Sequence, residues 1–226
     1  MKLYFIVEGE RTEMELYPKW LSFLLPELEK VDAYKKIKPD SYFLFCGMGI
    51  PAIYNHVINA IKDINEFPEY DYLIVCLDGE NAGVEIRKRK LIEKMTQHNV
   101  ILNEGCLLKI IVHNVSVEIW FLGNRKVIKQ NPAGNVFNEY LRHYNVKYQD
   151  PELMECKIPF TIKAQFHQSY LREAFKEHNL TYSKSRPGHV LDRSYFDELV
   201  KRVNDFPTHL QSLADFFAFV NEIKQR

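Results

Sequence analysis

Three acidic residues follow two apolar stretches of the chain. Glu8 comes directly after the apolar run over 4–7, and Asp78 and Glu80 end the run over 71–77. In strand geometry residues i and i+2 share a face, so Asp78 and Glu80 can point at one small volume. Crowded carboxylates need a positive counter-charge to stay ionised, and a hard divalent cation, Mg²⁺ or Mn²⁺, prefers oxygen ligands. The spacing therefore predicts a metal site; for Glu8 alone, a strand leaving the core through a polar turn is the alternative.

The elements that must position these acids alternate between strands and helices. Apolar strands are predicted at 4–7, 41–46, 71–77 and 107–112. Strand–helix alternation with continuous apolar strands predicts an α/β fold with a mainly parallel sheet flanked by helices. Such sheets bind their ligands at the carboxyl ends of the strands, which is where Glu8 and Asp78 would lie.

Local signals place the helices between the strands. Gly9 allows the first turn, and Thr12 with Glu15 three residues later fits a capping box. Pro18 either kinks the first helix or opens it after a looser turn, and Pro51 fits the first position of the second. The second helix carries an apolar stripe that is expected to be core: Ile53, Val57, Ile61 and Ile64. The charged stretch 27–40 is predicted to be a surface connection.

A third helix is expected from residue 82. It should turn Val84, Ile86, Leu91 and Met95 partly inward and its basic run, 87–90, largely outward. The basic run could contact phosphates, or it could be a solvated helix face. The Gly47-Met48-Gly49 segment before the second helix favours a turn over a phosphate loop.

Together, these motifs resemble those of the Toprim domain of topoisomerases, primases and nucleases. The resemblance rests on Val7-Glu8-Gly9-x-x-Thr12-Glu13 and on Asp78-x-Glu80-x-x-Gly83. The family has aspartate at both acidic positions of the second motif, so Glu80 is a conservative departure. A third stretch over 115–122, Val-Ser-Val-Glu-Ile-Trp-Phe-Leu, is similar to the Ser-x-Glu and Glu-x-Trp segment of OLD-family and RloB-like nucleases. The resemblance covers roughly the first half of the chain.

The resemblance implies a Rossmann-like Toprim core that binds one or two Mg²⁺ or Mn²⁺ ions and hydrolyses phosphodiester bonds. The implied metal ligands are Glu8, Glu13, Asp78, Glu80, Ser116 and Glu118. OLD-like nucleases also place a functional lysine after their acidic motifs, which points to Lys184, with Arg186 in support; an exposed basic loop is the alternative. Lys184 would stabilise the negative charge that builds up on the phosphate in the transition state. Glu8 is a second expected catalytic residue. Arg186 and Arg87 would contact nucleic acid. His113, at the end of the fourth strand, fits a structural role better than a catalytic one.

The remainder of the chain changes character near 131–134, so we predict a Toprim-like core over 1–125 and a mainly helical region over 126–226. Two stripes in this region are expected to be core: Ile162, Phe166, Tyr170 and Ala174, and Leu210, Leu213, Phe217 and Val220.

The composition excludes some classes of function and structure. The 226 residues carry 30 Lys+Arg against 30 Asp+Glu, which argues against a protein that coats nucleic acid by bulk charge. The four widely spaced cysteines support neither a zinc module nor a disulfide framework. Without an apolar stretch of membrane-spanning length, a soluble cytoplasmic protein with no membrane partner is expected.

The resemblance to OLD-family and RloB-like nucleases implies a nuclease acting on DNA or RNA, in anti-phage defence and often beside an ATPase. The chain has no Gly-x-x-x-x-Gly-Lys-Ser/Thr loop, so any ATPase partner must be a separate subunit. A topoisomerase would need a further domain to present a tyrosine nucleophile, and a primase of this type usually brings a zinc module. The main alternative is a non-catalytic Toprim-like scaffold within a defence complex, and a small-molecule phosphotransfer enzyme ranks behind it. The oligomeric state does not follow from these patterns.

Overall fold

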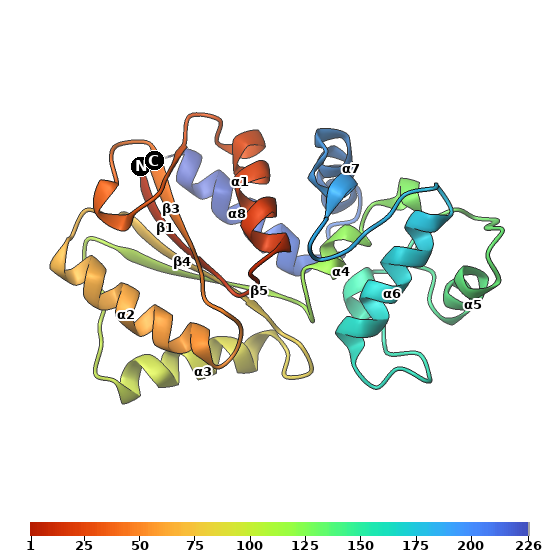
Figure 1. Cartoon of the computed structure of the whole chain (residues 1–226), viewed down its shortest axis with the longest axis horizontal. Helices are drawn as coiled ribbons and strands as arrows, with labels where there is room; N and C mark the ends of the chain where they lie inside the picture. Colours follow the sequence, from red (N-terminus) through yellow and green to blue (C-terminus); the bar gives the residue numbers. More distant parts are fainter. Residues whose placement is uncertain (226) are drawn as a thin grey trace. The chain divides into compact units, whose positions relative to one another are not determined.

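The computed structural model describes residues 1–225, and its elements are shown in Figure 1. Over these residues the chain divides into two compact units. Unit 1 comprises Met1–Asp78 and Val84–Val112, and unit 2 comprises Gly79–Gly83 and the chain from His113 onward. Each unit thus contains segments that are distant in the sequence, because the turn after Asp78 belongs to unit 2.

A five-stranded parallel sheet forms the centre of unit 1, counting strands within residues 1–225. Its strands are β1 (Lys2–Val7), β2 (Glu29–Val31), β3 (Ser41–Cys46), β4 (Tyr72–Asp78) and β5 (Leu107–His113). Their order is β2-β3-β1-β4-β5. Val7 at the end of β1 pairs with Cys46 of β3 on one side and with Cys76 of β4 on the other, so these strands end level with one another.

The four strands predicted from apolar runs are confirmed, and β2 is an addition. Most residues of β1 and β4 are buried on both faces, as continuous apolar strands of a covered parallel sheet should be. The stretch 27–40 was predicted to be a surface connection; it has no buried residue, as predicted, but it also contains the strand β2. Its residues Glu29 and Lys30 are exposed at the sheet edge, and the strand pairs with β3 through backbone groups, which leaves no apolar signal in the sequence.

Helices cover both faces of this sheet. They are α1 (Thr12–Leu24), α2 (Ala52–Glu66) and α3 (Val84–Gln97), with a short 3₁₀ turn η1 (Tyr34–Lys36). Tyr4, Ile6 and Val75 pack with α2 and α3 in one apolar cluster, and Phe5, on the opposite face of β1, contacts Tyr17 of α1. Figure 1 shows α2 and α3 together below the sheet and α1 above it. Unit 1 is therefore a Rossmann-like three-layer α/β arrangement.

Three details of these helices bear on the sequence predictions. Arg11, not Thr12, is the N-cap of α1, and its side chain makes no capping bond. Pro18 lies inside α1 and does not open it. In α3, Arg87 is only 7% exposed while Ile86 is 38% exposed, so the expected inward and outward positions of these two residues are reversed. Leu91 is buried as predicted.

Unit 2 is built almost entirely from helices in the part of the chain that the structure describes. Its α-helices are α4 (Glu118–Phe121), α5 (Asn135–His143), α6 (Lys163–Lys176), α7 (Arg193–Asp205) and α8 (Gln211–Lys224). Its 3₁₀ turns are η2 (Arg125–Val127), η3 (Pro151–Leu153) and η4 (Gly188–Leu191). The predicted stripe on α6 is largely confirmed, because Phe166, Tyr170 and Ala174 are fully buried. Ile162 precedes the helix as its N-cap and is 43% exposed.

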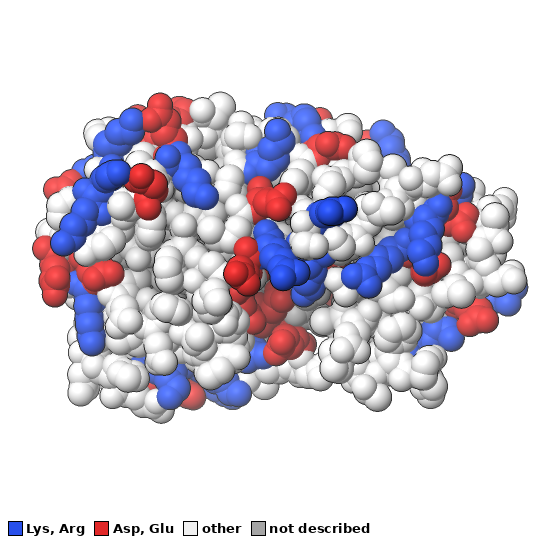
Figure 2. Space-filling view, viewed as in Figure 1, with Lys and Arg blue, Asp and Glu red and all other residues white. Residues whose placement is uncertain are grey.

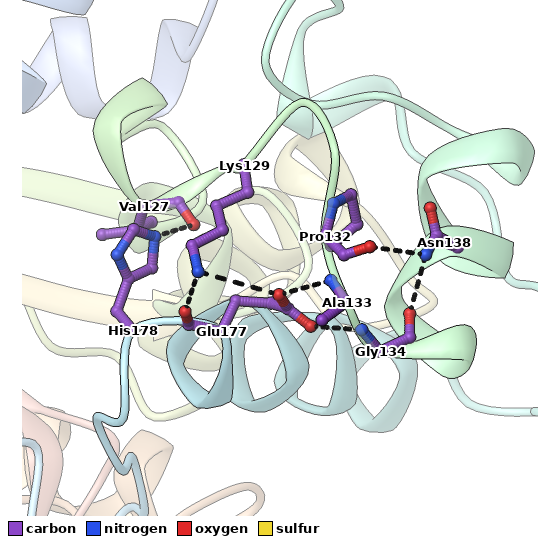
Figure 3. Close-up of polar contacts among 8 residues, drawn as sticks. All are labelled: Val127, Lys129, Pro132, Ala133, Gly134, Asn138, Glu177 and His178. Carbon is purple, nitrogen blue, oxygen red and sulfur yellow. Dashed lines mark hydrogen bonds and ion pairs between the residues drawn. The ribbon is translucent and has the colours of Figure 1, made fainter.

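The start of α5 is held by a carboxylate from the end of α6 (Figure 3). Glu177 accepts hydrogen bonds from the backbone N–H groups of Ala133 (2.9 Å) and Gly134 (2.7 Å). Lys129 donates to the Glu177 carbonyl oxygen and lies 3.9 Å from its carboxylate. The Glu177 carboxylate thus accepts from backbone N–H groups at the start of α5, whose N-cap residue makes no side-chain capping bond. The contacts join two segments more than 40 residues apart in the sequence.

The division into units falls between Val112 and His113, ahead of the predicted domain boundary between residues 125 and 126. Backbone contacts place α4 and the segment before it with the later helices of unit 2, although the predicted boundary assigned them to the core. None of the helices within residues 1–225 combines the length and apolar composition that crossing a membrane requires.

Candidate functional site

The acidic motifs of unit 1 lie where an open parallel sheet forms its ligand crevice. β1 and β4 are neighbours in the sheet, and the helices that follow them, α1 and α3, cover opposite faces. At such a topological switch point the connections diverge and leave a crevice beyond the carboxyl ends of the two strands. Glu8 follows the last residue of β1, and Asp78 is the last residue of β4. Chain topology therefore places both carboxylates at the crevice.

Glu8 and Asp78 are in direct contact. The backbone N–H of Asp78 donates to Oε2 of Glu8 over 2.9 Å, and the N–H of Glu8 donates to the carbonyl of Cys76 over 3.1 Å. The carbonyl of Glu8 in turn accepts from the N–H of Gly49 over 3.0 Å. Glu8 is thus fixed by backbone groups from β4 and from the turn after β3. The Glu8 carboxylate therefore lies beside the backbone of Asp78.

Glu13 lies against the same turn. It is in the first turn of α1 and is 4% exposed. A Cβ atom at Gly9 would collide with its carboxylate, so the glycine of this motif is what admits Glu13. Burial, followed by the nearby Cys76 and Glu13, raises the pKa of the Tyr17 hydroxyl well above its ordinary value. Burial likewise raises the pKa of the Cys76 thiol, so the thiol is neutral at pH 7.

Glu80 lies in a turn that belongs to unit 2. The N–H of Gly79 donates to the carbonyl of His113 (2.9 Å), and the N–H of Glu80 donates to the carbonyl of Val115 (2.7 Å). Glu80 and Val115 both have positive φ, +47° and +75°. For a β-branched residue this is a strained conformation that costs about 1–3 kcal/mol. Backbone bonds thus join the second acidic motif to the segment that carries the third, and they hold strain at that junction.

The third motif contributes a fully buried carboxylate. Glu118 is the first residue of α4 and has no exposed surface. Its Oε1 accepts a hydrogen bond from the Tyr182 hydroxyl (3.1 Å) and lies 3.7 Å from Nζ of Lys184. Among the described residues, its Oε2 and the hydroxyl oxygen of the buried Ser116 have no hydrogen-bond partner. A buried oxygen without a hydrogen-bond partner lowers the stability of the folded state. Both atoms are also oxygen ligands of the type that a hard cation prefers.

Lys184 and Arg186 lie on one tight turn. Ser183 and Arg186 exchange backbone hydrogen bonds of 3.3 and 3.0 Å, which brings Lys184 to Glu118. Tyr182 anchors the turn through its hydrogen bond to Glu118. The sequence did not predict this role. No local pattern points to a hydrogen bond between residues 64 positions apart. Arg186 is exposed.

Arg87 and His113 complete the set of residues considered in the sequence. Arg87 borders a pocket between α2 and α3. His113 is buried, with its ring 4.5 Å from that of Trp120 in an edge-to-face arrangement. This environment agrees with a structural role for His113.

The oxygen-rich donor set fits Mg²⁺ or Mn²⁺ in its chemistry, and the buried oxygens of Ser116 and Glu118 are unsatisfied without a further partner. Across residues 1–225, however, no three His, Cys, Asp or Glu side chains are arranged as a ready metal cage.

Charges on the visible face are mixed. Figure 2 shows Lys and Arg side chains interspersed with Asp and Glu, as expected for a chain with 30 residues of each sign. No family is identified by comparison: no known protein family matches the chain, nor does any curated protein or solved structure.

Proposed function

We propose that the protein is a Toprim-type, metal-dependent nuclease that hydrolyses phosphodiester bonds of DNA or RNA. The observation that carries the proposal is the contact between the Glu8 carboxylate and the Asp78 N–H at the switch point of the sheet. Acidic side chains at this position suit cation-assisted chemistry on a phosphate, because a cation offsets both their charge and that of the substrate. The motif resemblance names the same two residues.

Glu8 and Asp78 are the proposed central ligands, with Glu13 as a further ligand admitted by Gly9. Glu80, Ser116 and Glu118 are assigned to the same chemistry by the resemblance, and the unsatisfied oxygens of Ser116 and Glu118 support this assignment. One or two bound Mg²⁺ or Mn²⁺ ions would polarise the phosphate and lower the pKa of a bound water.

The turn around Lys184 supplies positive charge. Lys184 is proposed to stabilise charge on the phosphate in the transition state, and its ion pair with Glu118 holds it in place beforehand. Tyr182 is a positioning residue, because it acts through the Glu118 carboxylate. The exposed Arg186 is proposed to contact the nucleic acid backbone.

A thermal-shift and cleavage experiment tests the proposal. Millimolar Mn²⁺ or Mg²⁺ should raise the Tm of the wild type in a concentration-dependent way, because the ion binds only the folded state. Asp78→Asn should lose both the Tm shift and any metal-dependent cutting of DNA or RNA. Asp32→Asn makes the same chemical change at an exposed residue paired only with Lys36, and it should retain both. A wild-type protein that neither shifts nor cuts contradicts the proposal.

A non-catalytic scaffold in a defence complex is the second candidate. The lack of a ready metal cage within residues 1–225 favours it, and a separate ATPase subunit is the expected partner. Cytoplasmic anti-phage defence with such a partner is proposed for both candidates. Metal binding without cleavage, in the presence and absence of a co-purified ATPase, would favour the scaffold.

A further inference from the structure

Unit 1 has a pocket of about 370 Å³ between α2 and α3. One wall is apolar and comes from the start of α2: Ile50, Pro51 and Tyr54. The opposite wall is polar and comes from α3. The volume is within the usual range for small-molecule sites, roughly 300–1,000 Å³. No step of the proposed nuclease chemistry uses this pocket.

The polar wall concentrates positive charge. Arg87, Lys90 and Lys94 line it, at spacings of three and four residues that place them on one face of α3. Like charges at this spacing repel one another by a few tenths of a kcal/mol per pair. Within residues 1–225 neither Lys90 nor Lys94 forms an ion pair. An anion between them would remove this repulsion.

The single acidic residue in the lining does not cancel this charge. Glu93 is paired with Arg89 at 3.6 Å, and Arg89 is outside the pocket. Gln97 extends the polar wall by one further turn and adds a neutral donor and acceptor. The lining therefore carries a net positive charge in a chain whose total charge is zero.

The apolar wall contains an unsatisfied hydroxyl. Tyr54 is 6% exposed, and its hydroxyl has no hydrogen-bond partner among the residues that the structure describes. Leaving a buried hydroxyl unsatisfied costs about 1–3 kcal/mol. Pro51 is exposed and offers an apolar surface against which a planar ring can pack, and Tyr54 contributes a buried, unsatisfied hydroxyl to the same wall.

From these two walls we propose that the pocket binds a nucleoside phosphate. The base lies against Tyr54 and Pro51, and the phosphate lies between Lys90 and Lys94. The same chemistry is offered by a free nucleotide and by one nucleotide unit of a nucleic acid strand. The proposal does not depend on nuclease activity, because it involves none of the acidic motif residues.

The test measures binding by calorimetry in EDTA, so that metal chemistry does not contribute. The probes are AMP, adenosine, inorganic phosphate and a short 5′-phosphorylated single strand. AMP should bind at least tenfold more tightly than adenosine or phosphate alone, since only AMP engages both walls. Lys94→Glu should weaken AMP binding at least tenfold. Lys88→Glu is the matched control, because it makes the same charge change on the same helix, and neither Lys88 nor its ion-pair partner Glu85 lines the pocket; it should bind as the wild type does.

Further measurements distinguish a free nucleotide from a nucleotide unit of nucleic acid and test the contribution of Tyr54. If the strand binds more tightly than AMP and loses binding in Lys94→Glu, the ligand is a nucleotide unit of nucleic acid; if AMP binds and the strand does not, it is a free nucleotide. Tyr54→Phe keeps the ring and should weaken AMP binding several-fold with little change for inorganic phosphate. Asp78→Asn should leave AMP binding unchanged, which separates this site from the proposed nuclease centre. Absence of AMP binding, or equal weakening in Lys88→Glu and Lys94→Glu, overturns the proposal.

Discussion

At the scale of single residues, Ser212 is the centre of a buried hydrogen-bond chain in unit 2. Its hydroxyl accepts from Nε1 of Trp120 over 2.7 Å and donates to Glu152, whose carboxylate also accepts from the Ser212 N–H over 3.1 Å. Burial, opposed by the Ser212 hydrogen bond and reinforced by Asp150, raises the pKa of Glu152 to about 7. The chain thus includes a carboxyl group that changes charge near neutral pH.

Glu152 should make the protein less stable as pH rises from about 4.5 to 7. In that range the folded state keeps a proton that the unfolded state has released, so unfolding becomes easier with increasing pH. The full effect is roughly 3 kcal/mol. Glu152→Gln should therefore be more stable than the wild type at pH 8 and should lose this part of the pH dependence in urea unfolding. Glu155→Gln, at an exposed neighbour, should keep it; identical pH profiles for wild type and Glu152→Gln would refute the assignment.

His167 should have the opposite effect on the pH dependence of stability: it should make the protein less stable as pH falls. Its Nε2 contacts the carbonyl of Met154 over 3.0 Å, and burial lowers its pKa to about 4. Between pH 6.5 and 4 the unfolded state binds a proton that the folded state does not, so stability should fall as pH falls. Chemical-shift titration of the imidazole should show no protonation of His167 above about pH 5. Protonation near pH 6.5 in the folded protein would contradict the burial argument.

Tyr182 tests the environment of Glu118. Tyr182→Phe removes the hydroxyl donor and leaves a buried carboxylate oxygen with less support, which should cost about 1–3 kcal/mol of stability. If Glu118 contributes to catalysis, metal-dependent cleavage should fall more than the loss of folded protein explains. Tyr148→Phe is the control, because Tyr148 is half-exposed and remote in sequence from the motif. Equal effects of the two substitutions on unfolding would contradict a role for the Glu118 contact.

Glu8 and Asp78 could be brought together from the sequence alone, whereas Tyr182 could not. Each of the two acids ends an apolar strand, and parallel strands end at the same sheet edge, so their proximity follows from strand pairing. The Tyr182 contact depends on how a loop in unit 2 folds back across 64 residues, and no periodicity encodes it. The burial of Arg87 was not predicted. Four consecutive basic residues point in different directions around a helix, so at least one of them must face inward, and the sequence does not say which.

At the scale of elements, the start of α5 depends on Glu177 at the end of α6. The carboxylate accepts two backbone N–H groups in the position of a helix cap (Figure 3). These hydrogen bonds, the Ala133 bond first, lower the pKa of Glu177. The charge is also favourable at the positive end of a helix dipole.

Glu177→Gln should destabilise the protein by about 1–2 kcal/mol, since a neutral amide oxygen caps less strongly than a carboxylate. Urea unfolding at pH 7 measures the loss, and amide hydrogen exchange should show it concentrated in Asn135–His143. Glu173→Gln on the same helix removes only an exposed contact to Lys176 and should have little effect. A loss of protection spread evenly over α5 and α8 would point to a different cause.

Strong apolar runs gave reliable element predictions, and weak signals did not. The strands β1, β3, β4 and β5 were readable because continuous apolar residues are needed to fill a sheet covered on both faces. β2 was not, because an edge strand is held by backbone bonds and carries charged side chains. The start of α1 was misplaced by one residue, because its N-cap, Arg11, makes no capping bond and arginine is not a residue type that marks a helix start.

At the scale of the whole molecule, equal numbers of acidic and basic residues should produce a solubility minimum near pH 7. Proteins without net charge repel one another least and associate most easily. Solubility in polyethylene glycol should therefore rise on moving to pH 5.5 or pH 9. A monotonic change across this range would show that local charge clusters, such as the lysines of α3, dominate self-association.

The two tryptophans of the chain provide separate optical reporters. Trp20, in α1, belongs to unit 1, and Trp120, in α4, belongs to unit 2; neither has exposed surface. Replacing Trp120 by Phe leaves emission from unit 1 alone, and the Trp20→Phe protein reports unit 2. Comparing the two emission curves during denaturation would show whether both units lose structure in one cooperative step or in succession.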